Sequence, residues 1–419
     1  MSGVCALCNS GDISWVITAT ALVMIMTPGL GFFYGGLVRR KNLISTIAQC
    51  MVVFSIVSLV WAIWGYTMAF GPSVGDGFIG NLQYFALNNV GAGADTAYSA
   101  TIPALLFFAF QLKFAAITPA LVIGAFAGRI RLKPFLIFIV AWVTFIYLPI
   151  AHWVWGQGGW MRNMGVEDFA GGLVVHTSAG VTALAAALVI GRGEDFGKEA
   201  RPNNVPYVIL GTAILWFGWF GFNAGSALAA NAIAVNALVV TNLAAAAAGV
   251  TWMLIDWIWK GRPSVVGFCV GAVCGLAAVT PASGYVGPMW SLVIGIGAGA
   301  GCNLVASWRA RSRLDDSLDV FAAHGVGGMW GTVATGLFAS TVINAAGQNG
   351  LVYGGAHFAL VQLFAVGVVA AFAFVGSYVI LWVINFFSPL RASPTDQEKG
   401  MDEVYFGEEA YAPAAPNAS

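Results

Sequence analysis

Two histidines stand out because each lies deep within a long apolar segment. His176 follows Asp168 by eight residues, His324 follows Asp319 by five, and small residues come directly after both, in HTSAG and HGVGG. An imidazole titrates near neutral pH, so it can donate, accept or relay a proton. A buried ionisable side chain in a membrane costs free energy and by default marks a functional site. For a single histidine, the alternative is a structural hydrogen bond to a neighbouring helix.

Aromatic side chains form a second group of candidate residues. Phe110 and Phe114 are four residues apart, and Trp219, Phe222 and Ser226 follow one another at intervals of three and four. At these spacings each set shares one face of a helix. Packing against lipid or other helices is the alternative role for any one of these rings.

A hydroxyl and a further aromatic ring point to a small cation as the species that is bound. Ser226 lies one turn from Phe222 and can accept a hydrogen bond. Trp155, at the end of its apolar segment, can supply a π face, and a cation–π contact contributes about 0.5–2 kcal/mol. Asp168 begins its helix, so we expect it to cap the helix N-terminus and to shape the mouth of the site.

The composition requires these residues to be positioned by membrane-spanning helices. Of the 419 residues, 59% are hydrophobic and only 9% are charged. The apolar residues form blocks long enough to cross about 30 Å of hydrocarbon as a helix. The expected fold is an all-α polytopic membrane protein with eleven spans, at about 13–37, 44–70, 102–127, 135–155, 170–190, 206–229, 233–259, 265–279, 289–308, 320–340 and 357–387.

The basic residues predict how the chain is oriented. Sixteen of the 18 lysines and arginines lie in the segments that follow odd-numbered spans, and Arg162 is alone in a loop on the opposite side. Because basic loops stay in the cytoplasm, the N-terminus is predicted outside and the C-terminus in the cytoplasm. We expect a multi-pass protein of the plasma (inner) membrane.

The odd number of spans in each half predicts an inverted repeat. If spans 1–5 are duplicated as spans 6–10, the copies cross the membrane in opposite directions, and span 11 is additional. The two histidine-bearing spans would then enter from opposite faces and could meet. The transmembrane domain is expected to cover residues 1–387. Residues 388–419 would form a cytoplasmic tail with a net charge of −4, either a regulatory docking segment or simply a solvated one.

Several other residues carry more than one interpretation. Lys113 lies inside span 3 and must face a cavity, a partner carboxylate or a subunit contact. His152 and His357 lie at the ends of spans, where we expect contact with the membrane interface. Cys5 and Cys8 form a lone CxxC that is either a disulfide or a pair of inert thiols. The sequence shows no metal-ligand set and no cofactor motif, and its zero net charge does not favour a nucleic-acid partner.

Five segments of the chain resemble the ammonium transporter family (Amt/Mep/Rh), and its Amt branch in particular. They occur in the family's order and are TPGLGFFYGGLVRRKN, FQLKFAAITPAL, DFAGGLVVH, GWFGFNAGSA and DVFAAHGVGG. A tail segment, GMDEVYFGEEAY, is similar to the family's C-terminal motif. The chain departs from the family's pattern at Lys113, and at Phe406, which precedes Gly407.

The resemblance implies transport of ammonium, with methylammonium as an analogue, by a homotrimer with one pore in each subunit. It also implies that a cytoplasmic PII-type regulatory protein docks on the tail. The mechanism implied is capture of NH4+, loss of its proton, and passage of NH3 through a hydrophobic pore, with or without coupled proton movement. The implied roles are an external site of Phe110, Trp155 and Ser226 with Asp168 beside it, a gate of Phe114 and Phe222, and a pore lined by His176, His324 and Trp219.

Three other functions compete with this one. A sensor would use the same pocket for signalling, but sensor members usually carry an appended cytoplasmic domain, and 32 residues after span 11 are too few for one. An intramembrane enzyme would need a nucleophile, a metal set or a cofactor motif near the histidines, and none is evident, so we expect no enzyme. A channel for another neutral molecule would not need an aromatic mouth for a cation.

Overall fold

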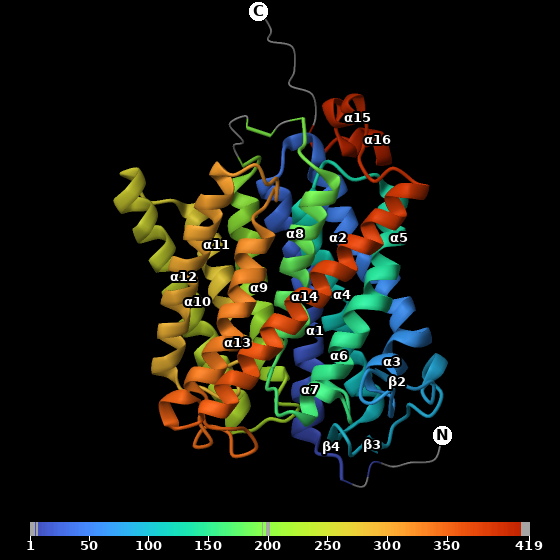
Figure 1. Ribbon diagram of the computed structural model, residues 1–419, viewed down its shortest axis with the longest axis vertical. Helices are drawn as coiled ribbons and strands as arrows, with labels where there is room; N and C mark the ends of the chain where they lie inside the picture. Colours follow the sequence, from blue (N-terminus) through green and yellow to red (C-terminus); the bar gives the residue numbers. More distant parts are fainter. Residues whose placement is uncertain (1–4, 6, 195, 198–201, 412–419) are drawn as a thin grey trace, which may run out of the picture.

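The computed structural model describes residues 5, 7–194, 196–197 and 202–411, and long helices dominate it. They run side by side between two ends, one carrying the N-terminus and the other the C-terminal tail (Figure 1). In these ranges nine helical segments are long and apolar enough to cross a membrane. The protein is a mostly helical, multi-pass membrane protein, as its composition predicts.

The first half of the chain supplies a continuous series of helices, several of which contain a π-helical turn. Its elements are α1 (Ser10–Leu37), η1 (Arg40–Asn42), α2 (Leu43–Val60), η2 (Trp61–Gly65), α3 (Tyr66–Phe70), α4 (Ala104–Phe126), α5 (Leu132–Trp142), η4 (Val143–Tyr147), α6 (Leu148–Trp155), α7 (Trp160–Asn163), η5 (Gly172–Thr177) and α8 (Ser178–Ile190). Between α3 and α4 lie β1 (Ser73–Val74), β2 (Ile79–Gly80), η3 (Phe85–Leu87), β3 (Ala94–Asp95) and β4 (Ser99–Pro103). The strands form two small antiparallel pairs, β1 with β2 and β3 with β4.

The second half repeats the helical pattern and ends in the tail. Its elements are α9 (Val205–Gly225), α10 (Ala232–Lys260), α11 (Val265–Val279), α12 (Pro288–Arg311), η6 (Phe321–Val326), α13 (Gly327–Phe338), η7 (Leu351–Tyr353), α14 (Ala356–Phe387), α15 (Pro394–Lys399) and α16 (Met401–Phe406). The expected eighth and tenth spans correspond to α11, of 15 residues, and to η6 continued by α13. Neither is among the nine long apolar helices, so the count of eleven stays a prediction.

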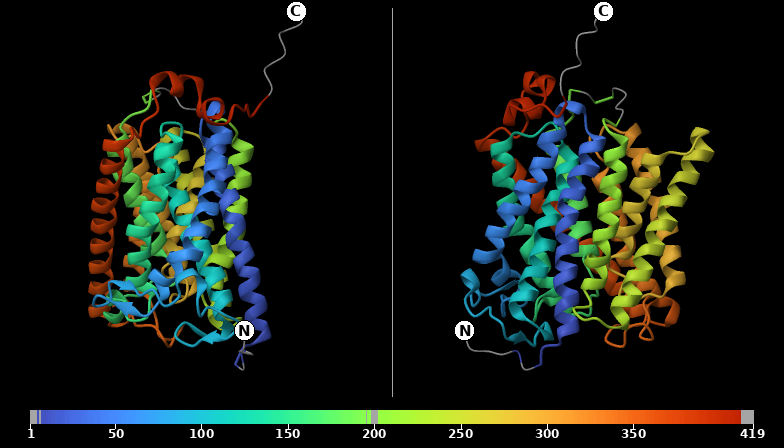
Figure 2. Two further views of the ribbon diagram at one scale, coloured as in Figure 1. Left: turned by 90° about the vertical axis from the view of Figure 1, so that its right-hand side faces the viewer. Right: turned by 180° about the vertical axis from the view of Figure 1, so that it is seen from behind.

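Corresponding helices of the two halves pack against each other at the centre. α1 packs along α9, and the two run in opposite directions (Figures 1 and 2). η5 packs against α13, and η6 packs in the same way against α8. This exchange of contacts is what an inverted repeat would produce, and it brings the two histidine-bearing segments together.

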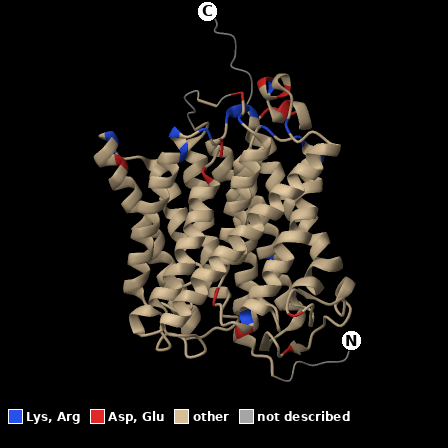
Figure 3. Ribbon diagram, viewed as in Figure 1, with Lys and Arg blue, Asp and Glu red and all other residues tan. Residues whose placement is uncertain are grey.

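Charged residues gather at the ends of the bundle and are sparse between them (Figure 3). Lysines and arginines concentrate at the end where the tail lies, the distribution on which the orientation was predicted. Of the basic residues used for that prediction, Lys198 and Arg201 lie outside the described residues.

The tail is folded against the bundle. The Asp402 carboxylate accepts hydrogen bonds from the backbone N–H groups of Ile44 (3.0 Å) and Ser45 (2.7 Å), at the start of α2. The Tyr405 hydroxyl donates to the carbonyl oxygen of Ile130 at 3.1 Å. A merely solvated tail is therefore excluded as far as residue 411.

The structure also resolves the expectations for His152 and for the Cys5–Cys8 pair. His152 is fully buried, with Nδ1 2.9 Å from the carbonyl oxygen of Ala69 and Nε2 2.9 Å from Oγ of Ser73. The prediction that it contacts the membrane interface is wrong, because α3 and β1 cover this end of α6 and each supplies one of the two partners. Cys5 and Cys8 form a disulfide.

Candidate functional site

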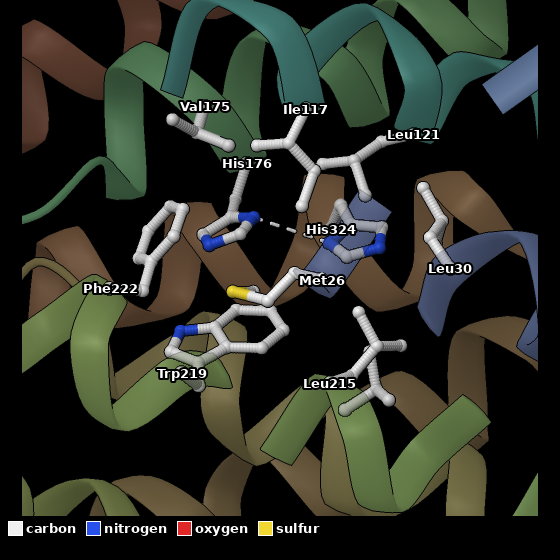
Figure 4. A pocket seen from close by; sticks show the side chains of 11 residues that line it. Met26, Leu30, Ile117, Leu121, Val175, His176, Leu215, Trp219, Phe222 and His324 are labelled. Atoms are coloured by element: carbon white, nitrogen blue, oxygen red, sulfur yellow. Dashed lines mark hydrogen bonds between the residues drawn. The ribbon is translucent and has the colours of Figure 1, made fainter. Parts of the chain in front are cut away.

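The two histidines lie side by side where η5 and η6 cross. Nδ1 of His324 is 3.2 Å from Nδ1 of His176, and the ring centroids are 5.2 Å apart (Figure 4). Their exposed fractions are 1% for His176 and 2% for His324. Both residues belong to π-helical segments that continue directly into α-helices, so each side chain is fixed by a regular, packed backbone.

Glycines four residues beyond each histidine allow the crossing. A Cβ atom on Gly328 would lie 2.6 Å from the carbonyl oxygen of Gly172 and 2.8 Å from Cβ of His176. A Cβ atom on Gly180 would collide with the backbone of Gly325, next to His324. Each histidine-bearing segment therefore packs closely against a glycine of the other half of the chain. A larger residue in place of either glycine would force the two histidines apart.

Asp168 caps the segment that carries His176. Its carboxylate accepts hydrogen bonds from the backbone N–H groups of Gly171 (2.8 Å), Gly172 (2.6 Å), Leu173 (2.8 Å) and Val174 (3.2 Å). Burial raises the pKa of this carboxyl group, and the hydrogen bonds from these N–H groups oppose the rise. One side chain therefore satisfies the free N–H groups of this helix end.

The second half uses Asp316 in the same way, and not Asp319, the aspartate that lies nearer to His324 in the sequence. The Asp316 carboxylate accepts a hydrogen bond from the backbone N–H of Phe321 at 2.7 Å, at the start of η6. Asp319 instead forms an ion pair with Arg309 at 2.7 Å. Asp316 precedes His324 by eight residues, the separation between Asp168 and His176, and this matching interval was the signal in the sequence.

The short contact between the histidines determines their tautomers. Only one hydrogen fits between two nitrogens at this distance, so one ring carries its proton on Nδ1 while the other presents a bare Nδ1. Two neutral rings in this arrangement are therefore opposite tautomers. Nε2 of His176 has no hydrogen-bond partner among the described residues, so it is free to bond to a small molecule beside it.

A narrow apolar cavity adjoins the pair (Figure 4). Its volume of about 10 Å³ suits roughly one water-sized molecule. Trp219 stacks on His176 with centroids 5.3 Å apart, while its indole N–H donates to the hydroxyl of Thr280 at 2.9 Å. The other residues that line the cavity were not predicted from the sequence, because ordinary apolar side chains form no recognisable motif. They are Met26, Leu30, Ile117, Leu121, Val175, Leu215 and Val273.

Two phenylalanines pack together beside this region, and one of them, Phe222, lines the cavity. The ring centroids of Phe114 and Phe222 are 4.2 Å apart with an angle of 35° between the planes, and each ring is 1% exposed. Phe222 is also 6.0 Å from His176, centroid to centroid. The pair comes from α4 and α9, so its spacing depends on how these helices pack.

The residues expected at the mouth lie around the same phenylalanine pair. The ring of Phe114 makes edge contacts with Phe110 at 5.0 Å and with Trp155 at 5.9 Å. The Trp155 indole N–H donates to the carbonyl oxygen of Asp168 at 2.8 Å, which ties the ring to the cap of η5. The Ser226 hydroxyl donates to the carbonyl oxygen of Phe222 at 2.8 Å, so its lone pairs remain available as acceptors.

Together, the fold and the site define a multi-pass helical membrane protein with a buried histidine pair beside an apolar cavity. Within the described ranges no group of three or more His, Cys, Asp or Glu residues is placed to hold a metal ion. The arrangement supplies aromatic faces, hydrogen-bond acceptors and two imidazoles, which suit a small species that can exist with or without a proton.

Comparison with known proteins identifies the family. Residues 14–411 match the model of the Ammonium Transporter Family. The chain is 46% identical over 402 residues to an ammonium transporter of Bacillus subtilis, covering 96% of this chain and 98% of that protein. It is 44% identical to the ammonium transporter Amt1 of Archaeoglobus fulgidus, covering 96% of this chain and 100% of that protein.

A solved structure agrees with the sequence relatives. The crystal structure of Mep2 from Saccharomyces cerevisiae is similar with a TM-score of 0.88 and 38% identity, covering 93% of this chain and 88% of that one. The chain belongs to the Ammonium Transporter Family.

Proposed function

We propose that this protein transports ammonium across the plasma membrane by capturing NH4+ at an outer aromatic mouth and passing NH3 along the histidine pair. The observation that carries the proposal is the pair itself, buried beside an apolar cavity with room for about one small molecule. Membership of the family supports ammonium as the substrate.

Capture would take place among Phe110, Trp155 and Ser226. Aromatic faces attract a cation, and the free lone pairs of the Ser226 hydroxyl can accept one of its N–H bonds. Asp168 would act as a positioning residue, because its carbonyl oxygen holds the Trp155 indole and its carboxylate holds η5. The site needs only modest affinity, since the ion must leave it.

The proton would be lost before the phenylalanine gate. Moving a small bare ion into hydrocarbon costs about 20 kcal/mol in the idealised Born limit, and neutral NH3 avoids that cost. NH3 would then pass Phe114 and Phe222 and form hydrogen bonds with the imidazoles. K+ has a similar size but no proton to lose, so the same barrier would reject it.

Two forms of this mechanism differ in the path of the proton. In the first, the proton returns to the outer solution, and transport is electroneutral. In the second, the paired imidazoles relay it inward, so each turnover moves a charge. A current recorded from membranes on a solid support after ammonium addition favours the relay, whereas verified uptake without a current refutes it.

Uptake by reconstituted vesicles tests the proposal as a whole. We expect saturable uptake of radiolabelled methylammonium that ammonium competes with and K+ does not. Replacing both histidines, His176→Leu with His324→Leu, should abolish uptake or its selectivity. His357→Leu is the matched control, because His357 is exposed at the start of α14 and remote from the pair in sequence. Unchanged K+-excluding uptake in the double variant would refute the pore assignment.

We extend the proposal to orientation, assembly and regulation. The transmembrane domain, residues 1–387, would place the N-terminus outside and assemble as a homotrimer with a pore in each subunit. The tail, residues 388–419, would lie in the cytoplasm and receive a PII-type regulatory protein. Co-purification of a purified PII protein with the full chain, lost when residues 388–419 are removed, tests the last point; equal binding to both forms would contradict it.

A further inference from the structure

Three polar side chains lie within the membrane-spanning helices without the partners that such groups need. Lys113 is half-buried on α4, and among the described residues its ammonium group contacts only the ring of Phe54, 5.0 Å from the centroid. Gln111, also on α4, has a buried Oε1 atom that has no hydrogen-bond partner among the residues that the structure describes. Asn242 is exposed on α10. Hydroxyl side chains at comparable depth, such as Ser55, instead bond to their own helix.

The depth of Lys113 makes its environment costly. It lies nine residues after the start of α4 at Ala104. At a rise of 1.5 Å per residue this is about 13 Å below the helix end, close to the middle of a hydrocarbon layer about 30 Å thick. A lysine at the centre of a span costs about 2.5–3.5 kcal/mol on insertion scales, and its side chain is too short to reach the headgroups from there. Lipid tails offer no acceptor, so the acceptor must come from protein.

Asn242 offers an acceptor at the matching depth. It lies ten residues after the start of α10 at Ala232, or about 15 Å below the helix end. α4 and α10 both begin at the end of the bundle that carries the N-terminus (Figure 1). Within one protomer α1 and α9 lie between them, so Lys113 cannot reach this amide in its own chain (Figures 1 and 2).

The residues around each polar group extend the match. Seven residues before Lys113, on the same face of α4, lies the partly exposed Leu106. Seven residues before Asn242, on the same face of α10, lies Val235, which is 66% exposed. Each face therefore presents an apolar residue near the outer end and a polar residue two turns deeper.

We propose that the ammonium group of Lys113 donates a hydrogen bond to the amide oxygen of Asn242 in a second copy of this chain. The contact joins two different faces, α4 of one protomer and α10 of the next. Repeating such a head-to-tail contact around a symmetry axis closes a ring. The inference rests on the homotrimer proposed above and assigns the contact that holds its subunits in register.

Paired cysteines test the contact directly. Lys113→Cys combined with Asn242→Cys should give disulfide-linked species of two and three chains when native membranes are treated with an oxidant. The control combines Lys113→Cys with Val250→Cys, which is exposed on α10 about 12 Å deeper. We expect at least ten times more cross-linked protein for the first pair. Equal cross-linking in both pairs, or cross-linking mainly to a different protein, overturns the proposal.

A charge substitution tests the same contact without cysteines. Asn242→Asp should raise the temperature at which the purified oligomer dissociates, because the new carboxylate faces Lys113. The same substitution should lower that temperature in a Lys113→Met background, where the carboxylate is left unpaired. Additive effects of the two changes would refute the contact, since residues that touch show coupling.

The mass of the wild-type protein in detergent separates the possible failures. A monomer would refute both the homotrimer and the contact. An oligomer whose paired cysteines do not cross-link selectively would refute only the contact. Methylammonium uptake is measured in the same preparations, so a failure of the transport proposal is read independently.

Discussion

The replacement of Gly328 by alanine tests whether close helix packing sets the histidine pair. The new Cβ atom would lie 2.6 Å from the carbonyl oxygen of Gly172, 2.7 Å from the backbone nitrogen of Thr177 and 2.8 Å from Cβ of His176. Ordinary van der Waals contact begins at 3.4 Å, so α13 and η5 must separate by roughly 0.6–0.8 Å. The histidine nitrogens, now 3.2 Å apart, would move to about 4 Å if they follow their helices, beyond hydrogen-bond distance.

The expected result is a loss of both stability and transport. Overpacking of this kind costs about 1–3 kcal/mol, which a thermal unfolding assay in detergent would detect. Methylammonium uptake by vesicles should fall at least tenfold, because the imidazoles no longer share a proton.

The neighbouring glycine provides the control for this substitution. A Cβ on Gly327 would meet its nearest atom, the carbonyl oxygen of Cys274, at 3.5 Å, so Gly327→Ala should leave both measurements near wild type. Wild-type stability and uptake in Gly328→Ala would refute the claim that this crossing sets the pair.

Three further predictions concern acidic side chains outside the membrane-spanning helices: Asp168, the adjacent Glu167, and Asp402 in the tail. Asp168→Asn keeps one acceptor oxygen but turns an N–H donor toward the backbone N–H groups of η5. The free energy of unfolding should therefore fall by about 2–4 kcal/mol, and methylammonium uptake should drop. Wild-type values of both would contradict the capping role. Burial raises the pKa of Glu167 from 4.5 to about 7, so the folded state favours the protonated acid, and the melting temperature should fall by a few degrees as pH rises through that interval. Glu167→Gln should remove this pH dependence of the melting temperature. An unchanged pH dependence would show that Glu167 is not its source. Asp402→Ala should release the tail and speed its proteolysis several-fold, because Asp402 caps α2. Glu403→Ala, which changes the exposed neighbouring residue, should leave the rate of proteolysis unchanged. Equal rates of proteolysis in the two variants would show that the cap on α2 does not hold the tail.

Much of the architecture could be predicted because it depends on local properties of the chain. A helix that crosses hydrocarbon needs a continuous apolar block, and such blocks are visible without knowledge of neighbours. The buried positions of His176 and His324 follow from the same blocks. Helical spacing also places Trp219, Phe222 and Ser226 on one side of α9. Helices also occur where the eighth and tenth spans were expected, as α11 and as η6 continued by α13, although both are shorter or less apolar than the nine long helices.

Helix ends were less predictable, because the cap of a helix depends on the path of the loop before it. Asp316 and Asp319 both precede η6, and the sequence alone does not say which of them caps it. In the structure Arg309 takes Asp319 for an ion pair, while the loop turns so that Asp316 reaches the N–H of Phe321. His152 was misplaced for a similar reason, since Ala69 of α3 and Ser73 of β1, which cover it, are distant in sequence.

The sequence by itself determined that this chain crosses a membrane repeatedly, that two histidines are buried in its spans, and that aromatic rings share helix faces with a serine. Only the tertiary structure decided that the two histidines, 148 residues apart, touch through their Nδ1 atoms. The physical reason is that burial follows from the composition of one segment, whereas a contact between segments depends on the angle and distance at which helices cross. Here Gly180 and Gly328 set that distance, and their effect appears only when both helices are in place.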